Sequence, residues 1–345
     1  MHPVRIGIIG LGTMGVEYAK IYSAHPLAKV VAVSSRRPER VREICARYKV
    51  PEGYDDYQRM LDRPDIDAVV VATPDNSHFV PARDVLISGK HALIEKPLTT
   101  NLSEADELVR ISRRSGKKVQ VAFNHRWLSP YHQTKVTIQD GRIGSVLAGY
   151  ARKNDTIWVP TENIKWAKDT TPAWFLSSHD IDLMRWFLNS EPTEVRALGR
   201  KELLKSKGID TYDIIQAQVK FASGAFVTFE SAWVYPNTFP SIVDSFLAIV
   251  GTAGHVHLDR KRESMEMSTD SSFQYPKVFL NANVFGRMRG AFPACLEDFL
   301  FAIRENTEPR VTVFDGRQVT ATLEAIHRSL ESHQTETIAP PAQED

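Results

Sequence analysis

The N-terminal segment most constrains this fold, because a short apolar strand runs directly into a glycine-rich turn. Residues 4–9 form the strand-like run, and residues 10–15 read G-x-G-x-x-G. In such a turn the first glycine permits the tight bend, the second lets backbone amides approach a pyrophosphate, and the third lets the next helix pack on the strand. A helix over about residues 14–24 and a strand at 29–34 complete a βαβ unit. This order of elements predicts dinucleotide binding.

Composition excludes several other classes of protein. The 345 residues allow two domains, and a net charge of +1 offers no sequence-wide basic field for nucleic acid. The two cysteines, Cys45 and Cys295, lie far apart, and no cluster has metal-ligand spacing. No apolar stretch reaches the ~18 residues of a membrane span, and a strand begins within a few residues of the N-terminus. We therefore expect a cytoplasmic protein with no nucleic-acid, membrane or metal partner.

Residues 1–124 alternate β-branched runs with amphipathic stretches, which is the rhythm of a doubly wound parallel sheet. The expected strands are 4–9, 29–34, 67–72, 91–95 and 119–123, and the expected helices are 14–24, 38–48, 55–61, 78–88 and 103–115.

Residues 125–345 have a different texture and predict a second, α+β domain with a mainly antiparallel sheet. Residues 260–290 are polar and weakly patterned, so they receive no assignment. The expected strands are 145–152, 193–201, 211–221, 225–234 and 246–258, and the expected helices are 131–140, 178–188 and 316–333.

Polar motifs follow three of the strands expected in the first domain. They are residues 73–78, 95–98 and 124–126. In open α/β sheets ligands bind outside the carboxyl ends of the strands, so these motifs should face the dinucleotide together with the glycine turn. The expected cofactor-binding residues are Gly10, Gly12, Thr13, Met14, Gly15, Ser34, Ser35, Arg36, Thr73, Pro74, Asn76, His78, Glu95, Lys96 and Asn124.

With these motifs the chain resembles the Gfo/Idh/MocA oxidoreductases, the family of glucose-fructose oxidoreductase and inositol dehydrogenase. The resemblance rests on the glycine turn, the A-T-P-x-N-x-H element at 72–78, E-K-P at 95–97 and H-D-I-D at 179–182. It implies a Rossmann domain followed by an open-faced sheet domain that forms a homo-oligomer, a dimer or tetramer. It also implies that Lys96 is the catalytic lysine and His179 its acid/base partner.

The local context of both residues supports these roles. Lys96 follows an apolar strand, where desolvation and a cationic nicotinamide would lower its pKa. Ser177 and Asp180 are spaced as a capping box, which would place His179 in the first turn of a helix, where the dipole favours the neutral base. A histidine that is merely satisfied at a domain interface remains the alternative. The implied reaction is hydride transfer to or from a carbon that carries a hydroxyl group.

The end of the second strand bears on the choice of cofactor. An acidic residue about 20 positions beyond the glycine turn normally binds the ribose hydroxyls of NAD, whereas arginine accommodates the phosphate of NADP. This chain has Ser34, Ser35 and Arg36 there and no carboxylate, which favours NADP. NAD remains the alternative, because an arginine at this place can also stack on adenine or lie in solvent.

Aromatic residues point to a sugar, sugar derivative or cyclitol as substrate, because flat rings suit the C–H faces of such molecules. Five of the six tryptophans fall within residues 127–186. Core packing is the alternative for them, but Trp158 and Trp166 lie in a polar loop. The expected substrate-binding residues are Arg126, Lys153, Trp158, Trp166, Lys96 and His179, with Asn154 and Lys165 as further hydroxyl-binding candidates.

One departure from the family pattern leaves the substrate and the direction of reaction open. Many polyol-oxidising members have an aspartate four residues before the histidine, where this chain has Phe175. Two other functions stay open. One is an NAD-dependent glycosidase that oxidises a sugar transiently and eliminates the aglycone, and the other is a non-catalytic nucleotide-sensing regulator on the same fold.

Overall fold

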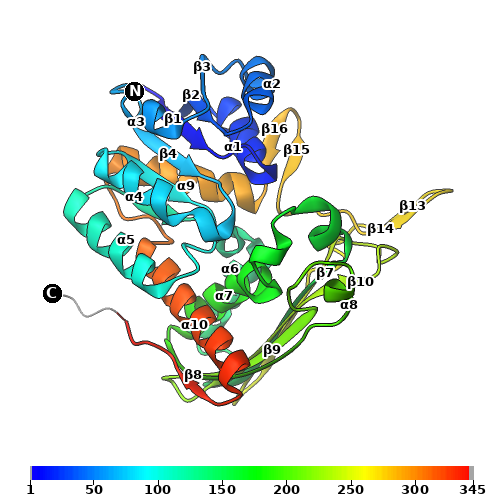
Figure 1. Cartoon of the computed structure of the whole chain (residues 1–345). Coiled ribbons are helices and arrows are strands. Elements are labelled where there is room, and N and C mark those ends of the chain that lie inside the picture. The colour runs from blue at the N-terminus through cyan, green and yellow to red at the C-terminus, as the bar shows by residue number, and fades with distance from the viewer. Residues whose placement is uncertain (1, 342–345) are drawn as a thin grey trace. The chain divides into compact units, whose positions relative to one another are not determined.

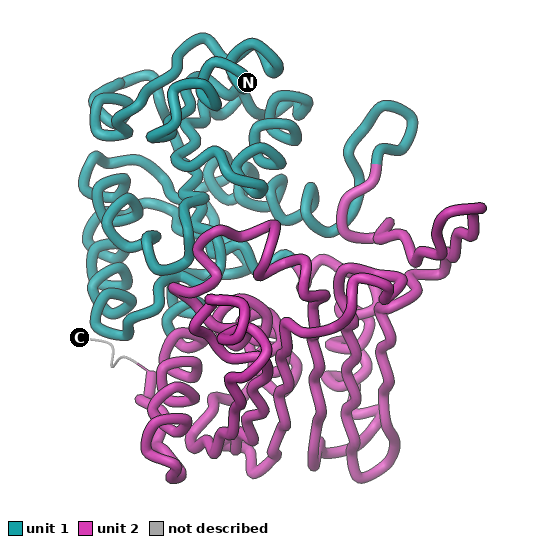
Figure 2. Tube along the Cα trace, turned by 45° about the vertical axis from the view of Figure 1, so that its right-hand side comes forward, with its two compact units in different colours: residues 1–124, 283–317 teal, residues 125–282, 318–345 magenta. Residues whose placement is uncertain are grey.

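The computed structural model describes residues 2–341 and consists of two compact units, drawn in teal and magenta in Figure 2. Unit 1 combines the chain up to Asn124 with Asn283–Arg317, and unit 2 combines His125–Ala282 with the chain from Gln318 onward. The expected second domain, residues 125–345, is therefore interrupted. The interruption has a packing reason: Tyr22 donates a hydrogen bond to the Leu296 carbonyl (3.3 Å), and its neighbour Tyr18 meets the ring of Phe292 edge to face.

Unit 1 is built on a six-stranded parallel sheet with the order β3-β2-β1-β4-β5-β6, which confirms the predicted doubly wound class (Figure 1). The sequence did not predict β3, because its three residues are short and mostly exposed. The strands are β1 (Val4–Ile9), β2 (Ala28–Ser34), β3 (Glu52–Tyr54), β4 (Ala68–Val71), β5 (His91–Ile94) and β6 (Val119–Val121).

Helices connect these strands and two more join them from the C-terminal part of the chain. Among residues 2–341 no helix combines the length and the apolar character needed to cross a membrane. The helices of unit 1 are α1 (Thr13–Ser23), α2 (Pro38–Tyr48), α3 (Tyr57–Leu61), α4 (Phe79–Ile87), α5 (Leu102–Ser115), α9 (Ala291–Glu305) and the first turn of α10 (Val313–Ser332), with the short turn η1 (Asp75–Ser77) after β4. The turn η2 (Asn124–Trp127) follows β6, and its residues from His125 onward belong to unit 2.

The turn between β1 and α1 requires glycine at two of its three glycine positions. Gly10 has φ +92°, and a Cβ atom there would lie 2.5 Å from the Ala72 carbonyl oxygen. A Cβ at Gly15 would lie 1.9 Å from the carbonyl oxygen of Gly10. A Cβ at Gly12 would meet nothing within 4 Å. Close packing of the backbone therefore explains Gly10 and Gly15, whereas Gly12 borders open space.

Unit 2 is built on a seven-stranded sheet with the order β12-β11-β7-β10-β9-β8-β17. All its pairs are antiparallel except β7 with β10, which pair in parallel because a long connection through helix α7 lies between them. The strand expected at 246–258 is two strands, since the chain turns at Gly251 and Gly254. The strands are β7 (Val146–Thr156), β8 (Pro192–Arg200), β9 (Ile214–Phe221), β10 (Phe226–Tyr235), β11 (Val243–Gly251), β12 (His255–Asp259) and β17 (Glu336–Thr337).

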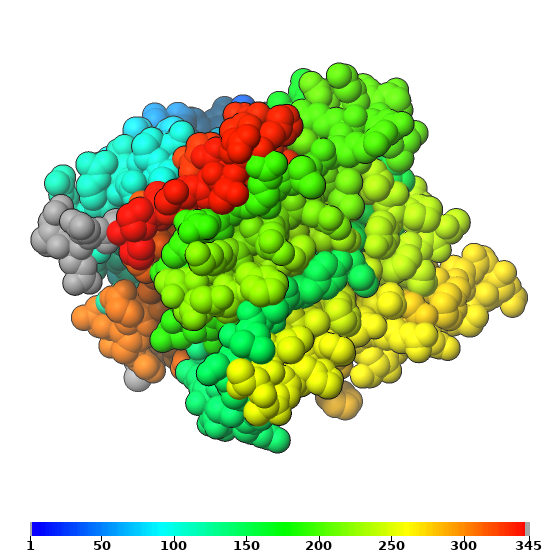
Figure 3. Space-filling view, turned by 90° about the horizontal axis from the view of Figure 1, so that it is seen from below, coloured from blue at the N-terminus to red at the C-terminus, as the bar shows by residue number. Residues whose placement is uncertain are grey.

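Helices cover one face of this sheet, and the other face is open (Figure 1). Helices α6 (Ser129–Gln139) and α7 (Ser178–Leu188) lie on the covered face with the C-terminal part of α10, where Ser329 accepts a hydrogen bond from the Ala197 amide of β8. Figure 3 views the unit from the open side, where the red C-terminal segment borders green β8 and the yellow segments lie beyond β7.

Shorter elements occupy the connections of unit 2 and the junction with unit 1. They are α8 (Leu203–Ser206), the turns η3 (Val159–Asn163), η4 (Ala167–Asp169) and η5 (Ala173–Ser177), and the hairpins β13 (Met267–Ser268) with β14 (Phe273–Gln274) and β15 (Ala282–Val284) with β16 (Arg287–Arg289).

The glycine turn gives a matched pair of variants. Gly15→Ala should destabilise the protein by about 1–3 kcal/mol, because its methyl group would overlap the Gly10 carbonyl. That loss corresponds to a fall in Tm of roughly 2–10 °C. Gly12→Ala should leave the Tm unchanged, because its methyl group meets open space. Thermal melts of both variants test this, and equal losses would show that the close approach to Gly10 does not decide stability.

Candidate active site

The carboxyl ends of β1 and β2 place the expected dinucleotide-binding residues at one edge of the sheet. Helix α1 begins after Gly12 with no side-chain cap, so its first amides point outward beside the open space at that glycine. Thr13 and Met14 form its first turn. At the end of β2 Ser34 is buried, and its carbonyl accepts a hydrogen bond from the Gly10 amide (2.9 Å). This uncapped helix end is suited to a pyrophosphate.

The two residues after β2 have different surroundings. The Ser35 hydroxyl accepts a hydrogen bond from the Arg37 amide (3.3 Å), and Arg36 is exposed. Arg37 and Arg40 instead direct their guanidinium groups to the Leu11 carbonyl. Arg36 is thus the guanidinium of this segment that points into solvent beside the end of β2.

His78 joins the segment after β4 to the segment after β5. Its ring is buried, with Nδ1 2.7 Å from the Pro97 carbonyl oxygen and Nε2 2.9 Å from the Thr73 carbonyl oxygen. Burial lowers the pKa of His78 to about 4. A neutral imidazole donates to only one of these carbonyls, and in either tautomer the ring fixes the distance between the two segments.

Glu95 anchors the backbone on the amino side of Lys96. Its carboxylate accepts hydrogen bonds from the Tyr18 hydroxyl (2.8 Å) and from the Lys96 amide (3.0 Å), and burial raises its pKa. The Lys96–Pro97 peptide bond is cis, and the Lys96 side chain is half-buried. Glu95 and His78 therefore hold the chain on both sides of Lys96.

The remaining expected cofactor residues lie in the same unit. The Thr73 hydroxyl donates to the Ser77 carbonyl (2.9 Å), which closes the turn that follows Pro74. Asn76 is exposed, and its side-chain oxygen accepts a hydrogen bond from Ser77 (3.0 Å). Asn124 is buried at the end of β6, and its Oδ1 has no hydrogen-bond partner among the described residues. A buried acceptor of this kind indicates a place for a donor from a ligand.

In unit 2, helix α7 carries His179, which is followed by two buried aspartates, Asp180 and Asp182. Asp180 accepts a hydrogen bond from Lys153 of β7 (2.6 Å), and both side chains are 4% exposed. Burial lowers the pKa of Lys153 and raises that of Asp180, while the attraction between the two groups opposes both shifts. The expected capping box is wrong: the Ser177 side chain makes no capping bond, because the π-helical turn η5 runs directly into α7.

The ring of His179 lies face to face with that of His125, with centroids 4.0 Å apart and planes inclined by 20°. His125 is buried, and its two ring nitrogens each lie 3.4 Å from a cationic group, Nδ1 from Lys153 Nζ and Nε2 from an Arg260 guanidinium nitrogen. Arg260 is in turn paired with buried Glu263 (2.7 Å). Four charged side chains thus surround the histidine that supports His179.

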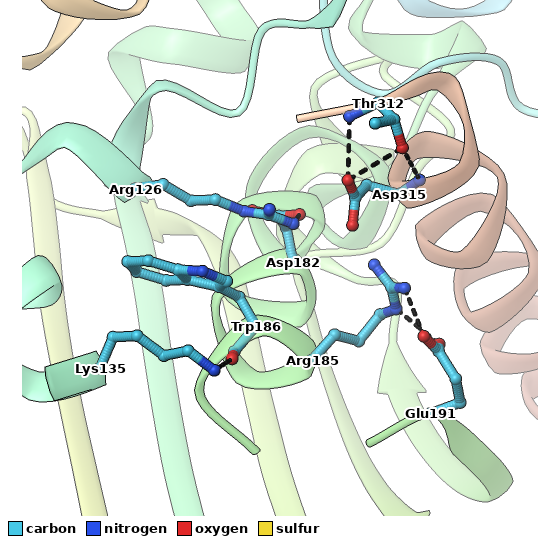
Figure 4. A network of polar contacts seen from close by, with 8 residues as sticks. All are labelled: Arg126, Lys135, Asp182, Arg185, Trp186, Glu191, Thr312 and Asp315. Carbon is cyan, nitrogen blue, oxygen red and sulfur yellow. Dashed lines mark hydrogen bonds and ion pairs between the residues drawn. The ribbon is translucent and has the colours of Figure 1, made fainter. Parts of the chain in front are cut away.

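Arg126 is also paired inside unit 2. Its guanidinium binds Asp182 through two hydrogen bonds (2.9 and 2.6 Å), and neither side chain is more than 9% exposed. Figure 4 shows Arg126 and Lys135 on the two sides of the Trp186 ring. Lys135 donates to the Trp186 carbonyl, and Arg185 binds Glu191. Arg126 and Lys153, expected as substrate ligands, therefore already bind the two aspartates of α7.

The tryptophans of the loop after β7 differ from one another. Trp158 is 40% exposed, and its amide donates to the Asn237 side chain (3.0 Å). Trp166 packs edge to face with Phe175, whose ring also meets buried Trp233. Phe175 therefore occupies an aromatic cluster where many relatives of the expected family have a carboxylate. Trp158 is the ring left available to a ligand.

Asn154 and Lys165 differ from the other expected hydroxyl-binding residues. Successive side chains of a strand point to opposite faces, so Asn154 lies on the face away from Lys153. Its amide donates to Glu230 (2.7 Å) and to the Tyr235 hydroxyl (3.0 Å). Lys165 is exposed in the loop.

Sequence reasoning did not assign His125, Asp180, Asp182 or Arg260 to the site. His125 was visible as the middle residue of the motif after β6, but nothing in the sequence shows that its ring stacks on His179. Arg260 lies at the start of the region that had no assignment. The aspartates had one available signal, their positions one and three residues after His179 on a helix.

Family models match both parts of the chain. Residues 4–123 match the model described as "Oxidoreductase family, NAD-binding Rossmann fold". Residues 135–338 match the model described as "Oxidoreductase family, C-terminal alpha/beta domain".

Individual relatives extend over nearly the whole chain. Myo-inositol 2-dehydrogenase of Thermotoga maritima is 26% identical over 340 residues, which are 95% of this chain and 96% of the relative. Scyllo-inositol 2-dehydrogenase (NAD(+)) of Bacillus subtilis is 28% identical and covers 91% of this chain and 90% of its own. Both relatives have low sequence identity to this chain, but each alignment spans most of both proteins.

A solved structure has the same fold. Scyllo-inositol dehydrogenase from Lactobacillus casei, with bound NAD(H) and scyllo-inositol, superposes with a TM-score of 0.84 at 21% identity and covers 97% of this chain and 99% of its own. At this identity the likeness shows the fold alone. Together with the two family models, it establishes that the chain is an oxidoreductase of the Gfo/Idh/MocA family, with an NAD-binding Rossmann domain and the C-terminal α/β domain of that family.

Proposed function

We propose that the protein is a dehydrogenase that transfers a hydride between a nicotinamide cofactor and a CH–OH carbon of a cyclitol, a sugar or a sugar derivative. The proposal rests on the side chains that each unit offers: unit 1 carries a half-buried lysine after β5, and unit 2 carries a histidine stacked on a second, buried histidine. Curated relatives of nearly equal length are named inositol 2-dehydrogenases, which supports a cyclitol as the first substrate class to test.

The glycine turn fits a dinucleotide cofactor. The outward amides of α1 and the open space at Gly12 would receive the pyrophosphate. When bound, the nicotinamide ring accepts or returns the hydride. We propose NADP, because exposed Arg36 beside Ser35 would pair with a 2′-phosphate and no carboxylate follows β2. NAD remains the alternative, and the Bacillus subtilis relative is named for it.

Lys96 would stabilise the negative charge that develops on the substrate oxygen. Its backbone is held by the Glu95 carboxylate and, through Pro97, by His78, so the ammonium group has a defined origin. A preorganised cation at the developing alkoxide is typically the largest electrostatic contribution to such a step. Substrate oxidation also releases a hydroxyl proton, which Lys96 does not need to accept.

His179 would accept that proton as the general base and return it in the reverse reaction. Its ring is half-exposed, so it remains accessible to a ligand, while its stacking on His125 fixes the plane of the imidazole. A neutral imidazole is the form that this role requires.

The charges of unit 2 favour a neutral polyhydroxylated substrate over an acidic one. Arg126, Lys153 and Arg260 each have a buried carboxylate partner, so none of the three presents an unbalanced positive charge. Trp158 offers an exposed ring for a C–H face of the substrate. The aromatic surroundings of Phe175 remove one hydroxyl-binding carboxylate relative to many polyol-oxidising members.

An activity assay distinguishes this dehydrogenase from two other functions, an NAD-dependent glycosidase and a non-catalytic regulator. A panel of cyclitols, sugars and aryl glycosides, supplied with each cofactor, should show net reduction of the cofactor with a free polyol. Cleavage of a glycoside without net change in the cofactor would support the glycosidase. Cofactor binding without any turnover would support the regulator, for which Lys96 and His179 have no evident use.

We also propose that the open face of the sheet in unit 2 forms a homo-oligomer, a dimer or tetramer. Leu198, Phe226 and Val250 lie on that face and are 65%, 48% and 45% exposed. Apolar side chains on three strands of one sheet gain stability when a second copy covers them. The second domain would then also serve in the assembly of the oligomer.

The proposed chemistry predicts the behaviour of two variants. Lys96→Met should keep the cofactor Kd near wild type and reduce kcat by roughly two orders of magnitude, because the alkoxide loses its cation. His179→Ala should reduce kcat similarly and remove the pH limb that reports the base. Lys168→Met, an exposed lysine of the loop, is the control. A tenth of wild-type kcat in Lys96→Met, or an unchanged pH limb in His179→Ala, would refute the assigned role.

Cofactor choice is tested at the end of β2. Ser35→Asp combined with Arg36→Ala should shift preference from NADP toward NAD, because a carboxylate repels the phosphate and accepts from the ribose hydroxyls. Losing a charge-assisted contact costs about 1.5–3 kcal/mol, roughly tenfold to over a hundredfold in Kd. Arg42→Ala, an exposed arginine of α2, should change neither Kd. Tighter binding of NAD than NADP by the wild-type protein overturns the NADP proposal.

The loop tryptophans should separate into two classes. Trp158→Ala should raise the substrate KM by about an order of magnitude, as expected for losing one aromatic platform, with the Tm unchanged. Trp166→Ala should instead lower the Tm, because its ring packs against Phe175 and the buried cluster around Trp233. Steady-state kinetics and thermal melts on both variants measure this, and a lower Tm with unchanged KM in Trp158→Ala would place the substrate elsewhere.

A further inference from the structure

His125 is a buried polar side chain of unit 2 with contacts on several sides, and the proposed reaction assigns it no step. It lies in η2, and its ring contacts groups from three other elements: His179 on α7, Lys153 on β7 and Arg260 in the segment after β12. A histidine that only packs in a core does not require a cation beside each ring nitrogen and a second histidine on its face. These contacts therefore indicate a functional role.

Both ring nitrogens of His125 face cationic donors. Arg260 keeps its charge at every pH at which proteins fold and, like the Lys153 ammonium at the same distance from Nδ1, it can only donate. A neutral imidazole accepts at one nitrogen and carries a proton on the other, so it accepts from only one of these two cations. A second proton on the ring would place the imidazolium against Arg260 on one side and Lys153 on the other. Double protonation of His125 is therefore disfavoured from both edges.

The two cations cannot turn away to relieve that conflict. The Lys153 ammonium is held by Asp180 at 2.6 Å, and the Arg260 guanidinium by Glu263 at 2.7 Å. All four side chains are buried. On the remaining side, the Tyr131 ring of α6 lies 6.0 Å from the His125 ring and below the Arg260 guanidinium. These contacts hold the ring of His125 in position and disfavour its doubly protonated form.

The stacked geometry transmits this restriction to His179. Two imidazolium rings 4.0 Å apart would repel each other, so at most one ring of the pair takes up a proton. Since the surroundings of His125 exclude it, the proton goes to His179. The neighbouring residue Asp180 is held by the same Lys153 that faces His125, which ties the backbone beside His179 to the stack.

We propose that His125 is a positioning residue for His179, a neutral, non-titrating ring that sets the plane of the base and leaves it as the one member of the stacked pair that exchanges a proton. This inference rests on the proposed function, in which His179 is the general base. It assigns to Lys153 and Arg260 the task of holding His125, in place of the substrate contact first expected of Lys153.

Histidine NMR titration of the full-length protein without substrate tests this inference directly. With ¹³C-labelled histidine, the Cε1–Hε1 signals of His125 and His179 are assigned from their disappearance in His125→Phe and His179→Gln. We expect the His125 signal to stay constant between about pH 5 and 8, where an ordinary histidine titrates, and the His179 signal to move. Titration of His125 in this range overturns the inference.

Removing the cation at Nε2 should release the restriction. In the double variant Arg260→Met with Glu263→Gln, which leaves no buried charge unpaired, the His125 signal should begin to titrate. A His125 signal that still does not move would show that Arg260 is not the cause.

Kinetics complete the test. His125→Phe keeps a flat ring and should retain kcat within about threefold, whereas His125→Ala should lose about tenfold or more in kcat with the cofactor Kd unchanged. His132→Ala, an exposed histidine of α6, is the control. Wild-type kcat and pH profile in His125→Ala contradict the inference. If His179→Ala remains fully active, the proposed function fails, whereas the NMR result on His125 still stands. If His125→Ala does not fold, the kinetics of His125→Phe and the NMR titration decide the inference.

Discussion

Unit 2 depends on two buried ion pairs that fasten α7 to its surroundings. Asp180 binds Lys153 of β7, and Asp182 binds Arg126 of η2. Both aspartates follow His179 in the sequence, so the backbone next to this residue, the proposed base, is held at two points. Breaking one such pair strands a buried charge at a cost of about 3–5 kcal/mol. The position of His179 therefore depends on these ion pairs in addition to the buried apolar residues of α7, Ile181, Leu183 and Met184.

Unit 1 solves a similar problem with hydrogen bonds to the backbone. Glu95 and His78 are buried, and they hold the chain on the two sides of Lys96 through hydrogen bonds to the Lys96 amide and the Pro97 carbonyl. The backbone at Lys96 is thereby held from both sides. Lys96 and His179, the two proposed catalytic residues, are thus alike in being half-buried beside anchored backbone.

Most of unit 1 was predictable because its signals are local. Apolar strands, glycine turns and helix periodicity each lie within a few residues, and among the strands of residues 2–124 the sequence missed β3. The interruption by residues 283–317 was not predictable, because α9 packs on Tyr18 and Tyr22 more than 260 positions earlier in the chain. In unit 2 the parallel pairing of β7 with β10 was also not predictable. The relative direction of these strands depends on the long connection between them, and the alternation of side chains along each strand does not reveal it.

The site residues show where sequence reasoning stops. Motifs predict Lys96 and His179 as catalytic residues, and this stays a prediction. Arg126 and Lys153 were expected as substrate ligands, and their bonds to carboxylates 56 and 27 positions away could not be predicted from the sequence. A cation near a predicted site has two destinations, a ligand or a buried partner, and only the fold distinguishes them. Here both cations bind aspartates of α7, which supports the proposal that the substrate contacts residues with exposed surfaces. Specificity should therefore depend on the loop after β7 more than on the charged cluster beneath His179.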